Sequence, residues 1–391
     1  MGTGSVVKGL IVPALLSILL TGCWDKIELN QLALVSMIGA DIEPESGIKT
    51  IYYQVINPLS GASAMGTTGG DQAPVYTYKI SGRSFGEIRS NVYQRLPRRL
   101  FVAHYKAVVV SERAAEHGIR DIVNYIEVQQ NARSSIPMLV ADGSISKIMK
   151  TYTPLESLPS DSVESRLRFL AEDSLFIGKH IRVKDVSERM QQSRPVVLPL
   201  IREAAGSSFH DSGKRAAEID ANKGIFLIGG GAVIQNYRLA GRLNENDMIW
   251  YHLLTGETGE QKIMLKVGGK QVTVVMKPVR FDQAAAYRRN KPVVSIRLDL
   301  ELSTSLATES IPRTWEDVEQ LEREVKEQIT DGLYAFYNKT KEKGWDLLGL
   351  KETVRRHLPQ LDPGSAGLND VDVVINVGAK LLQPGSINQP F

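Results

Sequence analysis

Residues 294–302 read Val-Ser-Ile-Arg-Leu-Asp-Leu-Glu-Leu, with apolar and polar side chains in strict alternation. Successive side chains of a β-strand point to opposite faces of its sheet, so this segment predicts a strand with one face in a core and one in water. Residues 272–276 and 371–377 repeat the alternation. Sheets with one wet face are commonly antiparallel or mixed, and the segment therefore indicates a sheet of that kind.

A long amphipathic helix is predicted after this strand, with Thr314 as its N-cap. Its apolar positions recur at spacings of three and four, at Trp315, Val318, Leu321, Val325, Ile329, Leu333 and Phe336. Glu319 with Arg323 and Glu322 with Lys326 are expected ion pairs on the wet side. We favour a helix packed across the sheet, and a free amphipathic helix on a membrane surface is the alternative.

The region from residue 23 to residue 155 predicts a mixed α/β unit. Its expected strands are 32–42, 48–56, 75–80, 102–110 and 136–141. A helix is expected at 85–96, and Ser111 is the expected N-cap of another helix whose apolar stripe runs to Ile126. The order strand, helix, strand indicates a βαβ unit within a mixed sheet, and the small residues of 61–70 indicate a loop.

The expected fold class is α+β, in three domains, with mixed or antiparallel sheets and a long packed helix in the last domain. The expected divisions are an N-terminal mixed α/β domain at 23–155, a small middle α+β domain at 156–204, a linker at 205–223 and a C-terminal α+β domain at 224–391. The middle division rests on prolines at its margins and on a helical stretch at 160–171. The polar, Gly- and Ser-containing composition of 205–223 indicates the linker.

Composition narrows the classes of function. The 391 residues include 47 Lys and Arg against 44 Asp and Glu, a net charge of +3. This balance gives no strong attraction to nucleic acid, so no nucleic-acid partner is expected. Cys23 is the single cysteine, which excludes a disulfide within the chain and disfavours a zinc site with thiolate ligands.

The N-terminus predicts a signal peptide over residues 1–22. Lys8 precedes the apolar run 9–20, which as a helix would rise roughly 18 Å. A membrane-spanning helix must cross a hydrocarbon core of roughly 30 Å, so the run is too short to span. Its length is typical of the apolar part of a secretory signal.

Leu20-Thr-Gly-Cys directly follows this run and resembles the lipobox of bacterial lipoproteins. The resemblance implies cleavage between Gly22 and Cys23 and a diacylglycerol on the Cys23 thiol. Two acyl chains anchor a protein stably without a transmembrane helix, so we expect the chain on the outer face of a membrane. In the alternative, the signal is not lipidated and Cys23 is incidental.

One catalytic motif competes with a structural interpretation. Residues 82–86 read Gly-Arg-Ser-Phe-Gly and fit G-x-S-x-G between an expected strand and an expected helix. Ser84 with Glu87 also fits a helix capping box after a strand that ends at Gly82. A hydrolase further needs an acid and a histidine brought together in space, which the sequence does not show. We favour the cap and expect no enzyme.

No metal or cofactor site is predicted. The six histidines are scattered, at His104, His117, His180, His210, His252 and His357. They form no H-E-x-x-H pattern or i,i+4 pair that would hold a metal. Gly229-Gly-Gly231 lacks the lysine of a phosphate-binding loop and predicts a hairpin turn.

Residues 23–30 (CWDKIELN) and 33–41 (ALVSMIGAD) are similar to the mature start of the C subunits of spore germinant receptors, the Ger(x)C lipoproteins of spore-forming bacilli and clostridia. The similarity continues in order at 97–100, 104–106, 224–227, 239–243 and 371–381. Leu348 stands where the family tends to have an aromatic residue before glycine, and no Trp shortly follows Pro359. The resemblance covers nearly the whole chain after residue 22.

This resemblance implies a three-domain α+β lipoprotein on the outer face of the spore inner membrane. It also implies two partners, the integral membrane A-type and B-type subunits of a nutrient receptor, for which this chain would be a scaffold or signalling subunit needed for germination. A solute-binding lipoprotein of an importer would share the anchor and is one alternative. A lipid-anchored serine hydrolase that uses Ser84 is the weaker one.

Overall fold

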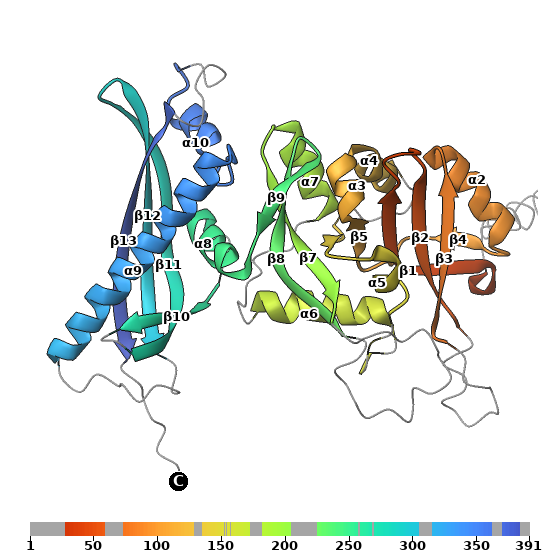
Figure 1. Ribbon diagram of the computed structural model, residues 1–391, viewed down its shortest axis with the longest axis horizontal. Coiled ribbons are helices and arrows are strands. Elements are labelled where there is room, and N and C mark those ends of the chain that lie inside the picture. The colour runs from red at the N-terminus through yellow and green to blue at the C-terminus, as the bar shows by residue number, and fades with distance from the viewer. Residues whose placement is uncertain are drawn as a thin grey trace, which may run out of the picture.

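The computed structural model describes residues 28–58, 73–128, 135–151, 153, 155–156, 158–172, 182–204, 225–256, 259–267, 270–304, 315–361 and 370–383. These residues form two bodies, each built on one β-sheet (Figure 1). Gly22, Cys23, Thr314, the expected loop at 61–70 and the expected linker at 205–223 lie outside the described residues.

The first body contains a nine-stranded mixed sheet in the order β3-β2-β1-β5-β6-β7-β8-β9, with β4 paired to β1. Its strands are β1 Leu32–Ile42, β2 Lys49–Ile56, β3 Val75–Gly82, β4 Arg99–Phe101, β5 Val108–Ser111, β6 Met138–Ala141, β7 Val196–Glu203, β8 Phe226–Gln235 and β9 Arg238–Leu243. The pairs β1·β5, β5·β6 and β6·β7 are parallel, while β1·β2, β2·β3, β7·β8 and β8·β9 are antiparallel. The predicted mixed sheet is confirmed.

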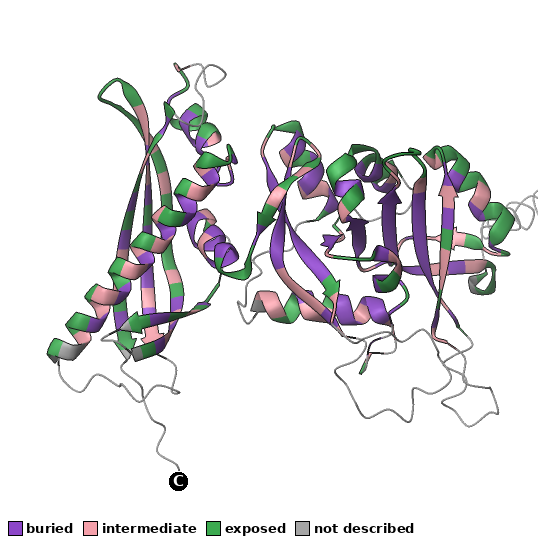
Figure 2. Cartoon of the chain, in the orientation of Figure 1, coloured by how far each residue is buried: buried purple, intermediate pink, exposed green. Residues whose placement is uncertain are grey.

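Helices cover both faces of this sheet. They are η1 Leu29–Gln31, α2 Phe85–Arg95, α3 Glu112–His117, α4 Arg120–Val128, α5 Ile145–Ile148, α6 Pro159–Glu172 and α7 Val183–Gln191. Buried residues of α2, α3, α4 and α7 share one core with the sheet, and those of α5 and α6 share another. Strands β5 and β6 are therefore buried along their whole length, which explains why their sequences are continuous apolar runs (Figure 2).

Local sequence patterns predicted the limits of several of these elements correctly and made others too long. Strand β1 has the predicted limits, and Ser111 caps α3 by accepting a hydrogen bond from the Ala114 N–H at 3.1 Å. Gly118, at φ 133°, divides the single helix expected there into α3 and α4. The strand expected at 102–110 is shorter, because only its last residues, from Val108 onward, pair with β1 and β6.

The first sheet crosses the expected domain boundaries. Strand β7 belongs to the expected middle domain at 156–204 but pairs with β6, and β8 and β9 belong to the expected C-terminal domain but extend the sheet beyond β7. Helix α6 packs on the same sheet. The boundaries at residues 155 and 224 therefore do not separate the sheets, because long-range strand pairing joins segments that composition had divided.

The second body contains a four-stranded sheet in the order β10-β11-β12-β13. Its elements are α8 Glu245–Thr255, β10 Gln261–Val267, β11 Lys270–Arg288, β12 Lys291–Thr304, α9 Trp315–Glu342, α10 Leu350–His357 and β13 Asp372–Gln383. Strand β12 contains the alternating segment that indicated this sheet, and its apolar side chains from Val294 to Leu302 are buried. It pairs antiparallel with β11 and parallel with β13.

Helix α9 lies along this sheet and confirms the predicted long packed helix (Figure 1). Ile329 and Leu333 are fully buried against the strands, so the alternative of a free amphipathic membrane helix is excluded. The expected pair of Glu319 and Arg323 is present at 3.8 Å. Glu322 instead accepts a hydrogen bond from the Leu381 N–H. No helix in the described part of the chain is long and apolar enough to cross a membrane.

The two bodies meet through side chains from both. Val197 and Val233 of the first sheet belong to the same hydrophobic cluster as α8, α9 and the second sheet. Trp345 lies directly on Gly241 of β9, where an added Cβ would come within 2.4 Å of the indole ring. Any side chain at this position would displace the indole, so Gly241 sets how closely the bodies approach.

Candidate functional site

Ser84 is a helix cap in the structure. Its hydroxyl accepts a hydrogen bond from the Glu87 N–H at 3.1 Å, and its backbone is extended, as at an N-cap. Glu87 accepts from the Arg83 N–H at 2.7 Å and so completes a variant of the expected capping box. Strand β3, which ends at Gly82, pairs only antiparallel with β2. A nucleophile elbow follows a strand of a parallel sheet, so this motif has the wrong surroundings for one.

The four described histidines do not come together. His104, His117 and His357 are exposed in separate parts of the fold, whereas His252 is buried in α8. Burial lowers the pKa of His252 to about 4. His180 and His210 lie outside the described residues, and within the described ranges no three His, Cys, Asp or Glu side chains are grouped to hold a metal ion.

An ion pair between the buried Asp41 and the exposed Arg113 joins the end of β1 to the start of α3. Arg113 donates to both carboxylate oxygens of Asp41, at 2.8 and 2.5 Å, and the Ser111 hydroxyl donates at 2.5 Å. Burial raises the pKa of Asp41, but the hydrogen bonds from Arg113 and Ser111 outweigh it and hold the pKa below its ordinary value. Every carboxylate oxygen is therefore occupied, and this cluster pins two elements together.

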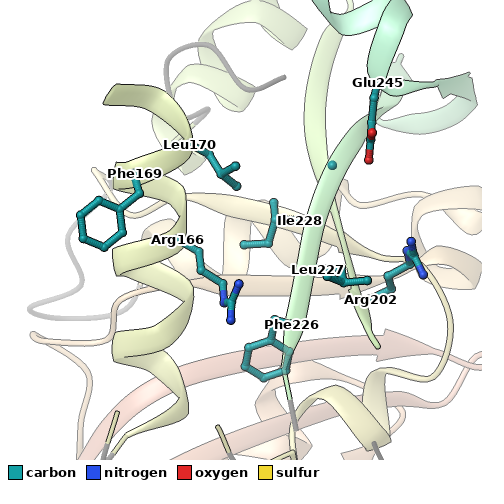
Figure 3. Close-up of a pocket in the computed structure, with 9 residues that line it drawn as sticks. Arg166, Phe169, Leu170, Arg202, Phe226, Leu227, Ile228 and Glu245 are labelled. Atoms are coloured by element: carbon teal, nitrogen blue, oxygen red, sulfur yellow. The ribbon is translucent and has the colours of Figure 1, made fainter. Parts of the chain in front are cut away.

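A cavity of about 480 Å³ lies between α6 and the N-terminal half of β8. It is lined by Arg166, Phe169, Leu170, Arg202, Phe226, Leu227, Ile228, Gly229 and Glu245. Figure 3 shows Arg166 and Leu170 extending from α6 toward β8, and Phe226 and Ile228 on the side of β8 that faces α6. Leu227 and Arg202 lie on the other side of the strand (Figure 3). The cavity therefore reaches both sides of β8.

The two arginines of this cavity lack carboxylate partners among the described residues. Arg166 donates through Nε to the Ser162 hydroxyl at 3.4 Å, and burial lowers its pKa. Arg202 is exposed. The opposite end of the cavity is acidic, because Glu245 at the start of α8 lies against Gly229. The site thus combines an apolar floor with two unpaired cations.

Two further hollows adjoin elements of the first sheet. Gly229 and Glu245 also line an open cavity of about 660 Å³ where α8 begins, and there Lys339 of α9 is paired with Asp247 at 2.6 Å. Another, also of about 660 Å³, lies beside Asn30 and is lined by Arg98 and Arg99. The second hollow is basic and lies close to the first described residues.

Sequence reasoning missed the cavity beside β8, because it took Gly229 to Gly231 for a hairpin turn. These glycines lie inside β8, and the turn is at Asn236 and Tyr237, both with positive φ. Gly230 has a φ of 68°, and a Cβ there would come within 2.8 Å of the Leu243 carbonyl. The glycines therefore allow the irregular register of the β7·β8 pairing. The apolar run before them was the sequence feature that could have predicted a strand here.

Two family models together match most of the chain. The one described as "Spore germination protein N-terminal domain" matches residues 25–203, and the one described as "Spore germination B3/ GerAC like, C-terminal" matches residues 229–385. The first ends with β7 and the second begins inside β8, so their boundary falls between two strands that pair in one sheet.

Curated relatives from Bacillus subtilis (strain 168) include "Spore germination protein KC", 35% identical over 164 residues, which are 41% of this chain and 40% of that protein. "Spore germination protein YndF" is 30% identical over 125 residues, 26% of this chain and 30% of that protein. The matched stretches span less than half the length of each relative. The "Crystal Structure of the GerBC protein" aligns with a TM-score of 0.56 at 14% identity, covering 88% of this chain and 97% of that one, which shows a shared fold.

Proposed function

The chain belongs to the Ger(x)C family of spore germination proteins, and from that membership we propose that it is the lipid-anchored subunit of a nutrient germinant receptor. In this role its folded part docks on the outer surfaces of two integral membrane subunits, of the A and B types. It serves there as a scaffold or signalling component that germination requires.

The observation that carries the proposal is the ordered family match across both bodies. Residues 25–203 and 229–385 together include elements of both sheets, the two cores of the first body and the core that joins the bodies. A shared single domain would say little about function, because one fold hosts many functions. A match that covers both sheets in order supports a shared role.

The N-terminal geometry is consistent with a membrane tether at Cys23. Glu28 is the first described residue and follows Cys23 by five positions, so the connection spans at most roughly 18 Å when fully extended. A lipid on Cys23 would keep the hollow with Arg98 and Arg99 close to the bilayer. Cationic side chains in that position gain free energy beside anionic headgroups.

The tether also supports the docking role energetically. Holding one partner on the membrane that contains the others raises its effective concentration, so a modest affinity suffices to keep a complex together. The role requires no catalysis, in agreement with the capping function of Ser84.

The decisive experiment deletes this chain from spores that keep both neighbouring membrane subunits. We expect loss of the response to one set of nutrients, measured as the fall in optical density during germination. Complementation with Cys23→Ala should leave an unprocessed or released protein and restore little of the response. An unchanged response to every nutrient, in a strain without a redundant paralogue, would contradict the proposal, and an importer gene beside its own would favour a solute-binding lipoprotein.

A further inference from the structure

Among the described residues, no strand pairs with one edge of the N-terminal half of β8. Strand β9 pairs with β8 only from Gly231 to Gln235, while β7 pairs with the other edge of β8 down to Phe226. The Ala204 N–H donates to the Ile225 carbonyl at 3.0 Å, so the main chain of Ile225 faces β7. Main-chain groups alternate along an antiparallel strand, which turns the N–H and C=O of Phe226 and Ile228 away from β7, toward the side without a neighbour.

Helix side chains bond to main-chain groups on the edges of three other strands, β3, β10 and β13. On β3, Arg95 and Asn91 of α2 donate to the carbonyls of Lys79 and Ser81, at 3.1 and 3.0 Å. Such bonds are one way in which proteins protect strand edges against unwanted pairing. Phe226 and Ile228 have no comparable side-chain bond within the described part of the chain, so this edge lacks the protection that α2 gives to β3.

Edges of the second sheet are occupied in the same way by α9. Tyr334 accepts from the Ile375 N–H at 3.0 Å and Glu322 from the Leu381 N–H at 2.7 Å, both on β13. On β10, Gln328 bonds both the N–H and the C=O of Lys266. At the edge of β8 the described residues supply no bond of this kind, so the edge can serve as a template for another strand.

The open edge coincides with the cavity beside α6. Phe226 to Gly229 form one wall, so a second strand placed there would lie inside the cavity. Its alternate side chains would point toward Leu170 and Arg166 on one side and toward Leu227 and Arg202 on the other (Figure 3). Each side has a guanidinium group that no described carboxylate pairs with, and a carboxylate is the group that satisfies it best.

We propose that this edge binds an extended acidic segment of a partner polypeptide by strand addition. Phe226 and Ile228 supply two N–H donors and two C=O acceptors to its main chain, and Arg166 and Arg202 pair with its carboxylates. Glu245 disfavours an acidic residue at the Gly229 end, which sets the position of the charges. That the partner is a receptor subunit rests on the proposed function, whereas the binding chemistry does not.

Main-chain recognition distinguishes this occupant from others. A docked helix has its backbone groups bonded internally and could not use those of Phe226 and Ile228. A lipid headgroup or a small anion could pair with the arginines but would ignore the strand edge. A change confined to a backbone N–H therefore separates the proposed occupant from both.

The test uses spores that carry the full receptor, with Phe169 replaced by the photo-crosslinking residue benzoylphenylalanine. Phe169 lines the cavity and is 52% exposed, so the replacement should be tolerated. After irradiation, we expect an adduct whose attached peptide, sequenced by mass spectrometry, is an acidic stretch of another polypeptide. Absence of an adduct, or attachment only to lipid or to a second copy of this chain, overturns the proposal.

Ile228→Pro removes the outward N–H, and proline is accommodated at such edge positions. We expect it to lower the adduct yield about tenfold, as for loss of a hydrogen bond and closer approach. Lys79→Pro is the matched control, because Lys79 has an outward N–H on the β3 edge of the same sheet. An adduct that persists in Ile228→Pro would contradict strand addition.

Arg202→Glu leaves the main-chain N–H groups of β8 unchanged. It tests the proposed binding if a thermal melt shows that Ile228→Pro does not fold. It should reduce the adduct, while Lys262→Glu, an exposed charge reversal on β10, should not. Equal yields from the two reversals would contradict acidic recognition. Loss of germination on deletion combined with an unaffected Ile228→Pro strain would defeat this inference alone, whereas normal germination on deletion would defeat the proposed function.

Discussion

The two sheets differ in how helices cover their faces and bond to their edge strands. The second sheet has fewer strands than the first. One long helix, α9, packs on it and also forms hydrogen bonds with main-chain groups of both edge strands, β10 and β13. The first sheet is covered on both faces by several shorter helices, and α2 bonds the edge of β3. On β8 the edge beside α6 has no paired strand in the described part of the chain.

This difference distinguishes contacts that stabilise the fold from a surface that remains available to bind another chain. An edge closed by its own helix contributes to stability and offers nothing to another chain. An open edge contributes no such bond and remains a template for pairing. Changes around α9 should therefore cost stability, whereas changes around α6 should cost binding.

The largest expected effect is at Leu333, which is fully buried between α9 and the second sheet. Leu333→Ala should lower the free energy of unfolding by about 3 kcal/mol, because it removes a buried side chain and leaves a cavity. Phe169→Ala on α6, where the ring is half exposed, should cost far less. Urea titrations of both variants measure the contrast, and equal losses would contradict it.

A fall in pH from 7 to 5 should destabilise the second body through His252. Its pKa is about 4 when folded, against 6.5 for the ordinary side chain. Between these values the unfolded chain binds more protons, so the free energy of unfolding falls as pH is lowered through 6.5, by about 2 kcal/mol at pH 5, and stops falling below 4.

His252→Leu is the control for this pH effect. Without the imidazole, the stability difference between pH 7 and pH 5 should shrink, as measured by denaturant titration at each pH. A variant with the same pH dependence as the natural chain would show that other groups cause it.

Next in size is the edge bond made by Glu322. Glu322→Ala leaves the Leu381 N–H of β13 without its acceptor and should cost about 1.5 kcal/mol, as for a hydrogen bond to a charged group. Glu319→Ala removes only an exposed ion pair at 3.8 Å on the same helix and should cost about 0.5 kcal/mol or less. If both variants melt at the same temperature, closure of this edge has no energetic value.

The smallest effect is expected at Ser84, which starts the helix that closes the edge of β3. Ser84→Ala should cost about 1 kcal/mol by loss of the cap. Ser90→Ala in the same helix removes only a bond to the Gly86 carbonyl and should be nearly neutral. A fluorophosphonate probe should not label Ser84, and labelling would show a reactive serine in place of a cap.

Local periodicity was sufficient to predict an element where the segment makes its contacts on one regular face. The alternation at 294–302 and the apolar spacing of α9 predicted β12 and the packed helix, because burial of a strand or helix face is written in its own sequence. Ser84 and Ser111 were recognised as caps for the same reason, since a cap bonds an N–H three residues away.

The pairing of strands that are distant in the chain could not be predicted from the sequence. Whether β7 and β8 extend the first sheet or begin separate sheets depends on partners far along the chain, and the expected divisions at 155 and 224 therefore do not follow the strand pairing. The glycines at 229–231 were likewise misread, because the approach of Gly230 to the Leu243 carbonyl exists only in the folded protein.

By itself the sequence determined the family, the α+β class and the elements that bury one regular face, because those depend on residue order and local spacing. Tertiary structure alone decided that β9 leaves one edge of the first half of β8 uncovered, that α6 lies beside that edge and that two arginines there have no carboxylate partner among the described residues. These features arise from the unequal lengths and register of paired strands, which are fixed only when the whole sheet assembles.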